Sequence, residues 1–463
     1  MVGSFMAVLD TTIVNVALPS IAAGIHAASA DLEWVVSGYA LAFGLALVPA
    51  GRLGDRFGYK PLFLGGIILF TLASLGCGLA SDPLVLIGAR VLQGLGAGIY
   101  YPAVSATIQR QFSGRDRSRA FGYLGSVVGL STAIGPLLGG VLIQFAGHDG
   151  WRLVFLVNVA IGAAEIPAAI KLLPRRHEPE EHGLDPAGNV LLAAALLLLL
   201  VPLVQGRAAG WPTWSWLCLA ASLVTATMLA WREIRLSHRG GEPVIQVDLL
   251  RRRSFAAGQV LALLYFAGFT SLFFTLSIAW QQGLGRTALA TGALVVPFAV
   301  CSLVTASISD RFTRRFGSLT VRAGITAMLA GQGLLLLVLH LGAPQPSAWA
   351  LAGPLALAGL GNGIVIAPNQ DFVLGSVPKT QAGTAGGTLI TAQRLGAAIG
   401  IAVIGTALFG GGSGGGNPGK ITPMLLDTAQ RATALNLLFI LGALISAFFL
   451  PRTLSAERAE ENA

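Results

Sequence analysis

The chain has 463 residues, of which 54% are hydrophobic and only 11% are charged. Soluble domains carry about 25% charged residues, so this composition, with a mean hydropathy of +0.72, excludes an ordinary soluble protein. The formal net charge is +9, but the Lys and Arg residues lie in short connections between apolar runs, which argues against a nucleic-acid partner. The three cysteines fall inside such runs and imply no disulfide framework.

Long apolar runs follow one another along the whole chain, as at Leu191–Leu203. A helix needs about 20 apolar residues to cross the hydrocarbon of a bilayer, and only helices or closed barrels satisfy their backbone groups there. A barrel would alternate apolar and polar residues in strands of about ten residues. The unbroken runs therefore predict an all-α integral membrane protein in contact with a lipid bilayer.

Fourteen transmembrane helices are predicted, at residues 1–21, 34–50, 62–80, 84–108, 120–145, 152–173, 187–205, 214–232, 257–280, 288–308, 320–341, 349–374, 383–409 and 431–450. Most Lys and Arg residues lie in the connections after the even-numbered spans, and the positive-inside rule then places both termini in the cytoplasm of a multi-pass cell-membrane protein. The first span has only nine residues before Asp10 and no basic residue ahead of it. We therefore expect a further N-terminal segment rather than a short, unanchored span.

A glycine-rich and basic segment, Gly51–Lys60, follows the second span. Glycine permits a tight turn, and Asp55 can pair with Arg or with a helix N-terminus. A plain basic turn is the alternative, but the spacing resembles the loop signature of the major facilitator superfamily between its second and third helices. The resemblance implies a gate network that breaks and re-forms during transport, with the members Gly51, Asp55, Arg56, Gly58 and Lys60.

The same pattern returns after the tenth span, where Asp310 and Arg311 take the places of Asp55 and Arg56. If each half is a six-helix repeat, spans seven and eight are an insertion between the halves. The expected architecture is the major facilitator fold, two six-helix bundles plus two inserted spans. Its expected units are an N-terminal bundle at 1–173, a linker with the inserted spans at 174–256, a C-terminal bundle at 257–450 and a cytoplasmic tail at 451–463.

An acidic residue, Asp10, lies inside the first span. A carboxylate within a bilayer is costly unless it is paired, protonated or functional. The run Leu9–Pro19 resembles the first-helix signature of the fourteen-span drug:proton antiporters of the superfamily, and the resemblance implies a proton-coupling role for Asp10. The alternative is a structural carboxylate that bonds to Thr or Asn of a neighbouring helix.

A basic residue, Arg90, lies deep inside the fourth span. A buried guanidinium needs a partner that accepts its hydrogen bonds. The run Arg90–Gly98 resembles the fourth-helix motif of the superfamily, which implies that Arg90 takes part in proton coupling. The alternative is a side chain that extends to the membrane interface.

Further segments add to the resemblance. In the fifth span, Gly135, Pro136 and Gly139 resemble the antiporter signature of the superfamily. Small residues permit close helix packing and a proline permits a bend, so a hinge and plain packing are both open. Trp151–Asn158 matches the fourteen-span group and also suits an interfacial anchor, and Thr391–Gly400 continues the resemblance in the thirteenth span.

A second intramembrane carboxylate, Glu165, belongs to no recognised signature. It is either a proton or cation site or a residue near the inner end that reaches Lys171 or water. The substrate is expected near the midplane between the halves, on apolar and aromatic walls with a few polar groups. The polar residues predicted to line that site are Gln93, Gln259, Tyr265, Gln332 and Arg394.

Nothing in the sequence predicts a catalytic or cofactor site. Gly414–Lys420 has the glycine and lysine spacing of a P-loop, but Ile421 replaces the Ser or Thr that binds Mg²⁺. We expect no enzyme activity, no metal and no cofactor, so transport must be driven by a gradient.

The resemblance implies a proton-coupled exporter of small, mostly apolar drugs, antibiotics or metabolites, which works as a drug:proton antiporter by alternating access. Inward proton movement supplies about 2.3 kcal/mol per charge per 100 mV. The expected partners are the small-molecule substrate, protons and lipid, with the monomer as the functional unit. The alternative is a carrier of the same fold for another solute, such as a siderophore or a nutrient, which could work by symport.

Overall fold

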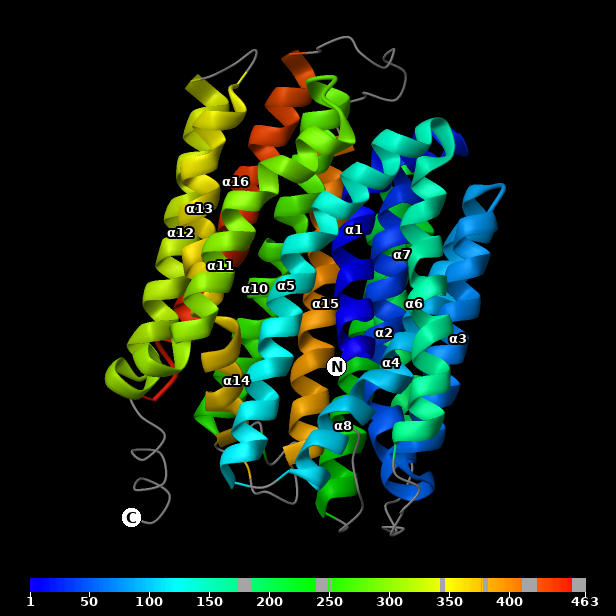
Figure 1. The fold of residues 1–463 in the computed structure, drawn as a ribbon, viewed down its shortest axis with the longest axis vertical. Helices are drawn as coiled ribbons and strands as arrows, with labels where there is room; N and C mark the ends of the chain where they lie inside the picture. Colours follow the sequence, from blue (N-terminus) through cyan, green and yellow to red (C-terminus); the bar gives the residue numbers. More distant parts are fainter. Residues whose placement is uncertain are drawn as a thin grey trace.

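The protein is built from helices that run along the long axis of one bundle (Figure 1). The computed structural model describes residues 1–112, 114–173, 185–238, 249, 252–341, 346–375, 377, 382–409 and 423–451, and every regular element within them is helical. The earlier helices are α1 (Val2–Gly24), α2 (Ser29–Phe57), α3 (Tyr59–Leu79), α4 (Pro83–Gln111), α5 (Gly114–Ala146), η1 (Gly147–Asp149), α6 (Gly150–Leu172), α7 (Pro186–Ala208) and α8 (Thr213–His238). The later helices are α10 (Arg253–Ile278), η2 (Ala279–Gly283), α11 (Ala288–Phe316), α12 (Ser318–Leu341), α13 (Ala348–Gly363), α14 (Ile366–Gly375), α15 (Ala382–Phe409) and α16 (Pro423–Ala447).

Length and apolar composition identify twelve candidate membrane spans within the described residues, one of which joins α13 and α14. α5 and α7 contribute shorter apolar stretches of described residues, Ile134–Ala146 and Ala187–Leu203. The chain is therefore a multi-pass membrane protein. The predicted number of fourteen spans is not confirmed by these criteria.

The helices pack in two groups. In the first group α4 packs on α2 and α3, α1 on α5, and α3 on α6; in the second, α10 packs on α15 and α16, and α13 on α11 and α12. The groups meet where α5 contacts α11 and where α2 contacts α15, while α7 and α8 pack mainly on each other. Most of the predicted linkers and tail, and the P-loop-like segment, lie outside the described residues, at 174–184, 239–248, 410–422 and 452–463.

Glycines bring helix backbones into direct contact both within the first group and where the two groups meet. A Cβ atom added to Gly96 of α4 would lie 2.6 Å from the backbone nitrogen of Phe70 in α3. One added to Gly292 of α11 would lie 2.3 Å from the carbonyl oxygen of Pro136 in α5. Small residues permit such close approach in membranes, so glycine is required both within the first group and where the groups meet.

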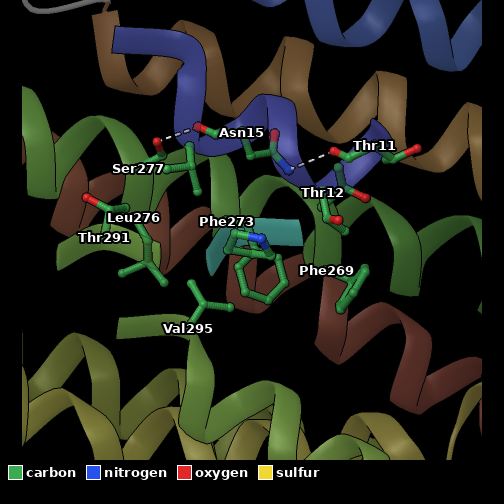
Figure 2. A pocket seen from close by; sticks show the side chains of 12 residues that line it. Thr11, Thr12, Asn15, Phe269, Phe273, Leu276, Ser277, Thr291 and Val295 are labelled. Carbon is green, nitrogen blue, oxygen red and sulfur yellow. Dashed lines mark hydrogen bonds between the residues drawn. The ribbon is translucent and has the colours of Figure 1, made fainter. Parts of the chain in front are cut away.

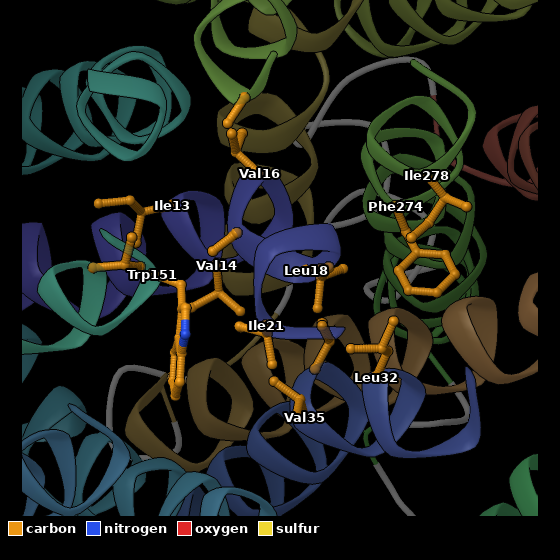
Figure 3. Close-up of a cluster of buried hydrophobic side chains, with 14 of the residues drawn as sticks. Ile13, Val14, Val16, Leu18, Ile21, Leu32, Val35, Trp151, Phe274 and Ile278 are labelled. Carbon is orange, nitrogen blue, oxygen red and sulfur yellow. The ribbon is translucent and has the colours of Figure 1, made fainter. Parts of the chain in front are cut away.

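One apolar cluster joins the two groups at the end of the bundle that contains Gly24, which we call the distal end. Figure 3 shows Ile21 of α1 near Val35 of α2, with Phe274 of α10 on the far side of the cluster. Further buried members come from α3, α4, α5, α6, α11, α15 and α16. The two other large clusters draw their buried members from one group each, whereas a smaller cluster of α2, α7 and α15 also joins the groups. The distal cluster is thus the larger of the two apolar clusters that join the groups among the described residues.

Replacing Gly96 by alanine should destabilise the protein, because the neighbouring backbone of α3 has to move. Overpacking of this kind costs about 1–3 kcal/mol, which thermal unfolding in detergent will measure. Gly88→Ala on the same helix is the control, since no atom lies within 4 Å of the added Cβ and alanine favours helix over glycine by about 1 kcal/mol. Equal unfolding temperatures for the two variants would contradict the packing.

Candidate functional site

Asp10 lies in the middle of α1 and is fully buried. Its Oδ2 atom is 2.6 Å from Nη1 of Arg90 in α4. Its Oδ1 atom accepts hydrogen bonds from Nε2 of Gln93 in α4, at 2.9 Å, and from Nδ2 of Asn158 in α6, at 2.8 Å. Three donors on two oxygens is the pattern of an ionised carboxylate, which only accepts. Asp10 is thus the centre of a polar cluster that joins α1, α4 and α6.

The Arg90 guanidinium turns into the bundle toward Asp10 rather than outward to the membrane interface, and it is only 1% exposed. Its Nε atom donates to the carbonyl oxygen of Val35 in α2 at 2.9 Å, and Nη1 also donates to Oε1 of Gln93 at 2.5 Å. The guanidinium carbon lies 4.1 Å from the centre of the Tyr39 ring, a favourable cation–π arrangement. One side chain therefore ties α2 and α4 to α1.

Gln93 was expected to line the substrate site, but the structure places it inside this cluster. Its Nε2 atom also donates to Oγ of Ser74 in α3, at 2.7 Å. The physical reason is its spacing, because Gln93 follows Arg90 by three residues and shares its helix face. Asn158 was not predicted to act, although it ends the Trp151–Asn158 motif. Only the placement of α6 beside α1 reveals that it donates to Asp10.

The buried charges of Asp10 and Arg90 depend on each other. Protonation of Asp10 would leave the Arg90 charge buried without its counter-charge, and breaking a buried pair costs about 3–5 kcal/mol. A cost of this size would favour another position of α1 relative to α4 and α6 if the Asp10 charge were neutralised. The arrangement is therefore suited to link protonation to helix movement.

A cavity lies on another face of α1, between the two helix groups (Figure 2). It contains about 530 Å³ of empty space, including its open part. Its walls combine aromatic rings with hydroxyl and amide groups and carry no charged side chain among the residues that line it: Thr11, Thr12, Asn15, Val16, Pro136, Phe269, Thr270, Phe273, Leu276, Ser277, Thr291 and Val295. Mostly apolar walls with a few polar groups are typical of small-molecule sites.

Helix α1 presents the carboxylate and the cavity residues on different faces. Successive residues of a helix are rotated by about 100°, so Asp10 faces α4 and α6 while Thr11, Thr12 and Asn15 face the cavity. Asp10 is not among the residues that line the cavity. Any movement of α1 would therefore change both the Asp10 cluster and the cavity.

The other residues predicted to line the substrate site do not line this cavity. The Tyr265 hydroxyl donates to Oδ1 of Asn362 at 2.8 Å, inside the second group. Gln332 of α12 and Gln259 of α10 are buried, and the Arg394 guanidinium lies 4.2 Å from the Phe43 ring centre where α15 contacts α2. The sequence places these side chains at membrane depth but does not say which helix face meets the cavity.

The predicted antiporter signature lies where α5 contacts α1. A Cβ atom on Gly135 would lie 2.0 Å from Oγ1 of Thr12, and one on Gly139 would lie 2.9 Å from Cγ1 of Ile13. Pro136, between them, lines the cavity. The glycines thus permit close packing, and the proline forms part of the cavity wall.

The turn between α2 and α3 has the conformation that its glycine permits. Gly58 has a φ of +94°, which is readily adopted only by glycine. Nζ of Lys60 donates to two carbonyl oxygens at the end of α6, at 2.7 and 2.6 Å, where a cation is favoured. Gly51 lies within α2, and the side chains of Asp55 and Arg56 lie outside the described residues.

In the second group α11 continues past the repeated motif, and its positive-φ residue, Gly317 with a φ of +56°, comes later than Gly58 does after Asp55. Oδ2 of Asp310 lies 2.5 Å from Nη2 of Arg314, four residues later, and both side chains are exposed. Arg311 is also exposed. Exposed pairs contribute little to stability.

Glu165 of α6 lies beside Gly3 at the start of α1. Its Oε2 atom is buried and has no hydrogen-bond partner among the described residues. It belongs neither to the Asp10 cluster nor to the cavity lining. The structure therefore places Glu165 apart from Asp10, the other carboxylate predicted within the membrane.

Comparison with known proteins decides the family. The family model of the Major Facilitator Superfamily matches residues 1–401. The chain belongs to the Major Facilitator Superfamily. It is 36% identical to a probable actinorhodin transporter of Streptomyces coelicolor, over 88% of this chain and 70% of that protein. It is 33% identical to a tetracenomycin C resistance and export protein of Streptomyces glaucescens, over 88% of this chain and 74% of that protein.

The fold agrees with this assignment. The structure resembles that of a solved auto-inhibited POT family peptide transporter with a TM-score of 0.67, covering 99% of this chain and 96% of the other at 15% identity. The family and its relatives are transporters and indicate no catalytic activity. The cavity and the Asp10 cluster therefore lie within a membrane transporter.

Arg90→Met should lower the free energy of unfolding by about 3–5 kcal/mol, because it leaves the Asp10 charge buried and unpaired. The double variant Asp10→Leu with Arg90→Met should regain much of this loss, since neither charge remains. Denaturant unfolding in detergent measures both effects. Arg314→Met, which breaks an exposed pair, is the control and should cost at most about 1 kcal/mol. A double variant as unstable as Arg90→Met would contradict the pairing.

Proposed function

We propose that this transporter exports small, mostly apolar and uncharged compounds in exchange for protons, by alternating access. The observation that carries the proposal is the position of α1, with an uncharged cavity on one face and the buried Asp10–Arg90 pair on another. The substrate binds in the cavity. Asp10 takes up a proton from one side of the membrane and releases it on the other, and the movement of α1 links the two events.

The chemistry of the cavity supports this substrate class. Phe269 and Phe273 offer aromatic faces, and the hydroxyls of Thr11, Thr12 and Ser277 can bond to carbonyl or hydroxyl groups of a ligand. A permanent cation would find no counter-charge among the lining residues. Two relatives at 36% and 33% identity carry the names of actinorhodin and tetracenomycin C, which supports export of an aromatic metabolite or antibiotic.

We also propose fourteen spans. α5 has 33 residues and α7 has 23, and about 20 residues are enough to cross the hydrocarbon. The six-helix bundles are then 1–173 and 257–450, separated by a linker with two inserted spans at 174–256 and followed by a tail at 451–463. The monomer is the proposed functional unit, and the proton gradient is its energy source without a cofactor.

The proposed location is the cell membrane, with both termini in the cytoplasm. The excess of Lys and Arg in the connections after the even-numbered spans supports this orientation. The distal end then faces the outside of the cell. The apolar cluster at that end closes the outer side of the transporter in this conformation.

Asp10→Asn should abolish export that is driven by a proton gradient and retain part of substrate binding. Asparagine keeps the size of the side chain but cannot carry the proton, and Asp10 does not line the cavity. In inverted vesicles that hold an imposed pH gradient, tetracenomycin C is the first test compound, followed by a chemically varied panel of toxic compounds. Addition of an exported compound should collapse the gradient.

The matched control is Glu165→Gln, which removes a carboxylate outside the cluster and should keep most of the export. Full gradient-driven transport by Asp10→Asn would remove Asp10 from the mechanism. A wild-type protein that exports compounds without any proton flux would overturn the antiport proposal itself.

Phe273→Ala should weaken binding of an aromatic substrate, because the ring of Phe273 forms part of the cavity wall (Figure 2). Burial of a phenylalanine side chain is worth about 1.5–3 kcal/mol, so the expected loss of affinity is roughly 10- to 100-fold, measured by equilibrium binding of an exported aromatic compound. Phe145→Ala is the control, since Phe145 is 85% exposed. Equal affinity of both variants would place the substrate elsewhere.

A further inference from the structure

Helix α1 contains a proline, Pro19, near its distal end. Proline has no backbone N–H, so the carbonyl oxygen four residues earlier loses its helical donor, and the ring pushes that carbonyl aside. The residue four positions before Pro19 is Asn15. An unpaired carbonyl in a membrane interior is costly, and the Asn15 carbonyl therefore needs a donor from outside α1.

Helix α10 of the other group supplies that donor. Oγ of Ser277 donates to the Asn15 carbonyl oxygen at 2.5 Å (Figure 2). Nε2 of Gln281 donates to the next carbonyl oxygen, that of Val16, at 2.9 Å, and lies 3.2 Å from Oγ of Ser277. Two neighbouring side chains of α10 therefore hold two neighbouring carbonyls of α1.

The sequence around these donors suits the contact. Ser277 and Gln281 are four residues apart and so lie on one helix face. Gln281 lies in η2, the π-helical turn Ala279–Gly283 that directly follows α10, and such wide turns are frequent at functional sites.

The contact lies between the cavity and the distal cluster. Ser277 and Val16 both line the cavity, while Val16 and Ile278 belong to the distal cluster. The α1 to α10 bonds thus join the two halves where the cavity ends and the closed side begins.

We propose that Ser277 and Gln281 are positioning residues of the transport cycle, which hold the distal end closed by donating to the α1 carbonyls beside Pro19. Opening of the distal end separates α1 from α10 and must break both bonds. Each hydrogen bond contributes about 0.5–1.5 kcal/mol net. Loss of one bond therefore shifts the equilibrium toward the open form by roughly two- to tenfold. This inference goes beyond export and rests on the proposed function only for the side to which the distal end opens.

The test measures opening directly, without substrate or proton gradient. A reporter cysteine replaces Ile404, which is fully buried in the distal cluster, in a full-length chain that also carries Cys218→Ser and Cys301→Ser. Cys77 is a buried member of the same cluster, so it is replaced by alanine, and the chain without the reporter gives the background. A membrane-impermeant maleimide is added to right-side-out vesicles and to inverted vesicles, and the labelling rate is recorded.

Ser277→Ala and Gln281→Leu should each raise the labelling rate by roughly two- to tenfold, and the double variant should raise it further. Ser277→Thr keeps the hydroxyl that donates to the Asn15 carbonyl, so it should restore the wild-type rate. Ser271→Ala is the matched control. It removes a hydroxyl of the same helix that bonds to Asn436 of α16, within one group, and should leave the rate unchanged.

Wild-type rates in both Ser277→Ala and Gln281→Leu would overturn the proposal, as would an equal rise in Ser271→Ala. If Ser277→Ala fails to fold, Gln281→Leu and Ser277→Thr decide the matter. Faster labelling only in inverted vesicles would overturn the proposed orientation while keeping the inference. If the labelling rates follow the expected pattern but the protein exchanges no protons, the proposed function is overturned and this inference stands.

Discussion

The ion pair between Asp10 and Arg90 is the constraint on which the first helix group depends. Two charges that are 0% and 1% exposed are tolerable within a membrane only when both are paired and their remaining hydrogen-bonding positions are filled. The backbone of α2 and the side chains of α4 and α6 fill them. Four helices must therefore lie at fixed distances from one another, and the glycines of α4 permit that spacing by admitting the α2 and α3 backbones.

A second constraint acts where the two halves meet. Glycines bring α5 and α11 into backbone contact, and Pro19 frees an α1 carbonyl that Ser277 of α10 satisfies. Close packing and hydrogen bonds restrict the relative position of two helices in different ways. Hydrogen bonds are directional, so the bonds from Ser277 and Gln281 to two α1 carbonyls restrict the position of α10 relative to α1. The interface thus combines close helix packing with directional hydrogen bonds.

The sequence predicted those parts of the molecule that depend on composition and on local spacing. The all-α fold and the family followed from apolar runs and from motifs, and motifs singled out Asp10 and Arg90, which the structure brings together as an ion pair. The same information could not assign helix faces across the bundle. Gln93 was placed in the substrate site because it is polar and lies at membrane depth, but its partner is Asp10. Ser277 and Gln281 carried no signal, because their role exists only once α10 lies beside the proline of a helix more than 250 residues earlier.

The separation of the carboxylate from the cavity bears on the kind of exchange this protein can perform. If Asp10 lined the cavity, a substrate and a proton would compete for the same group, and the substrate would need a charge or a strong donor to displace the proton. Here the cavity residues that face a ligand are uncharged, and Asp10 is saturated by protein donors on a different face of α1. In the proposed exchange the two ligands therefore act on the position of one helix rather than on one atom. A site of this kind needs only that the substrate fit and move α1, which suits compounds that share apolar and aromatic character but no common charged group.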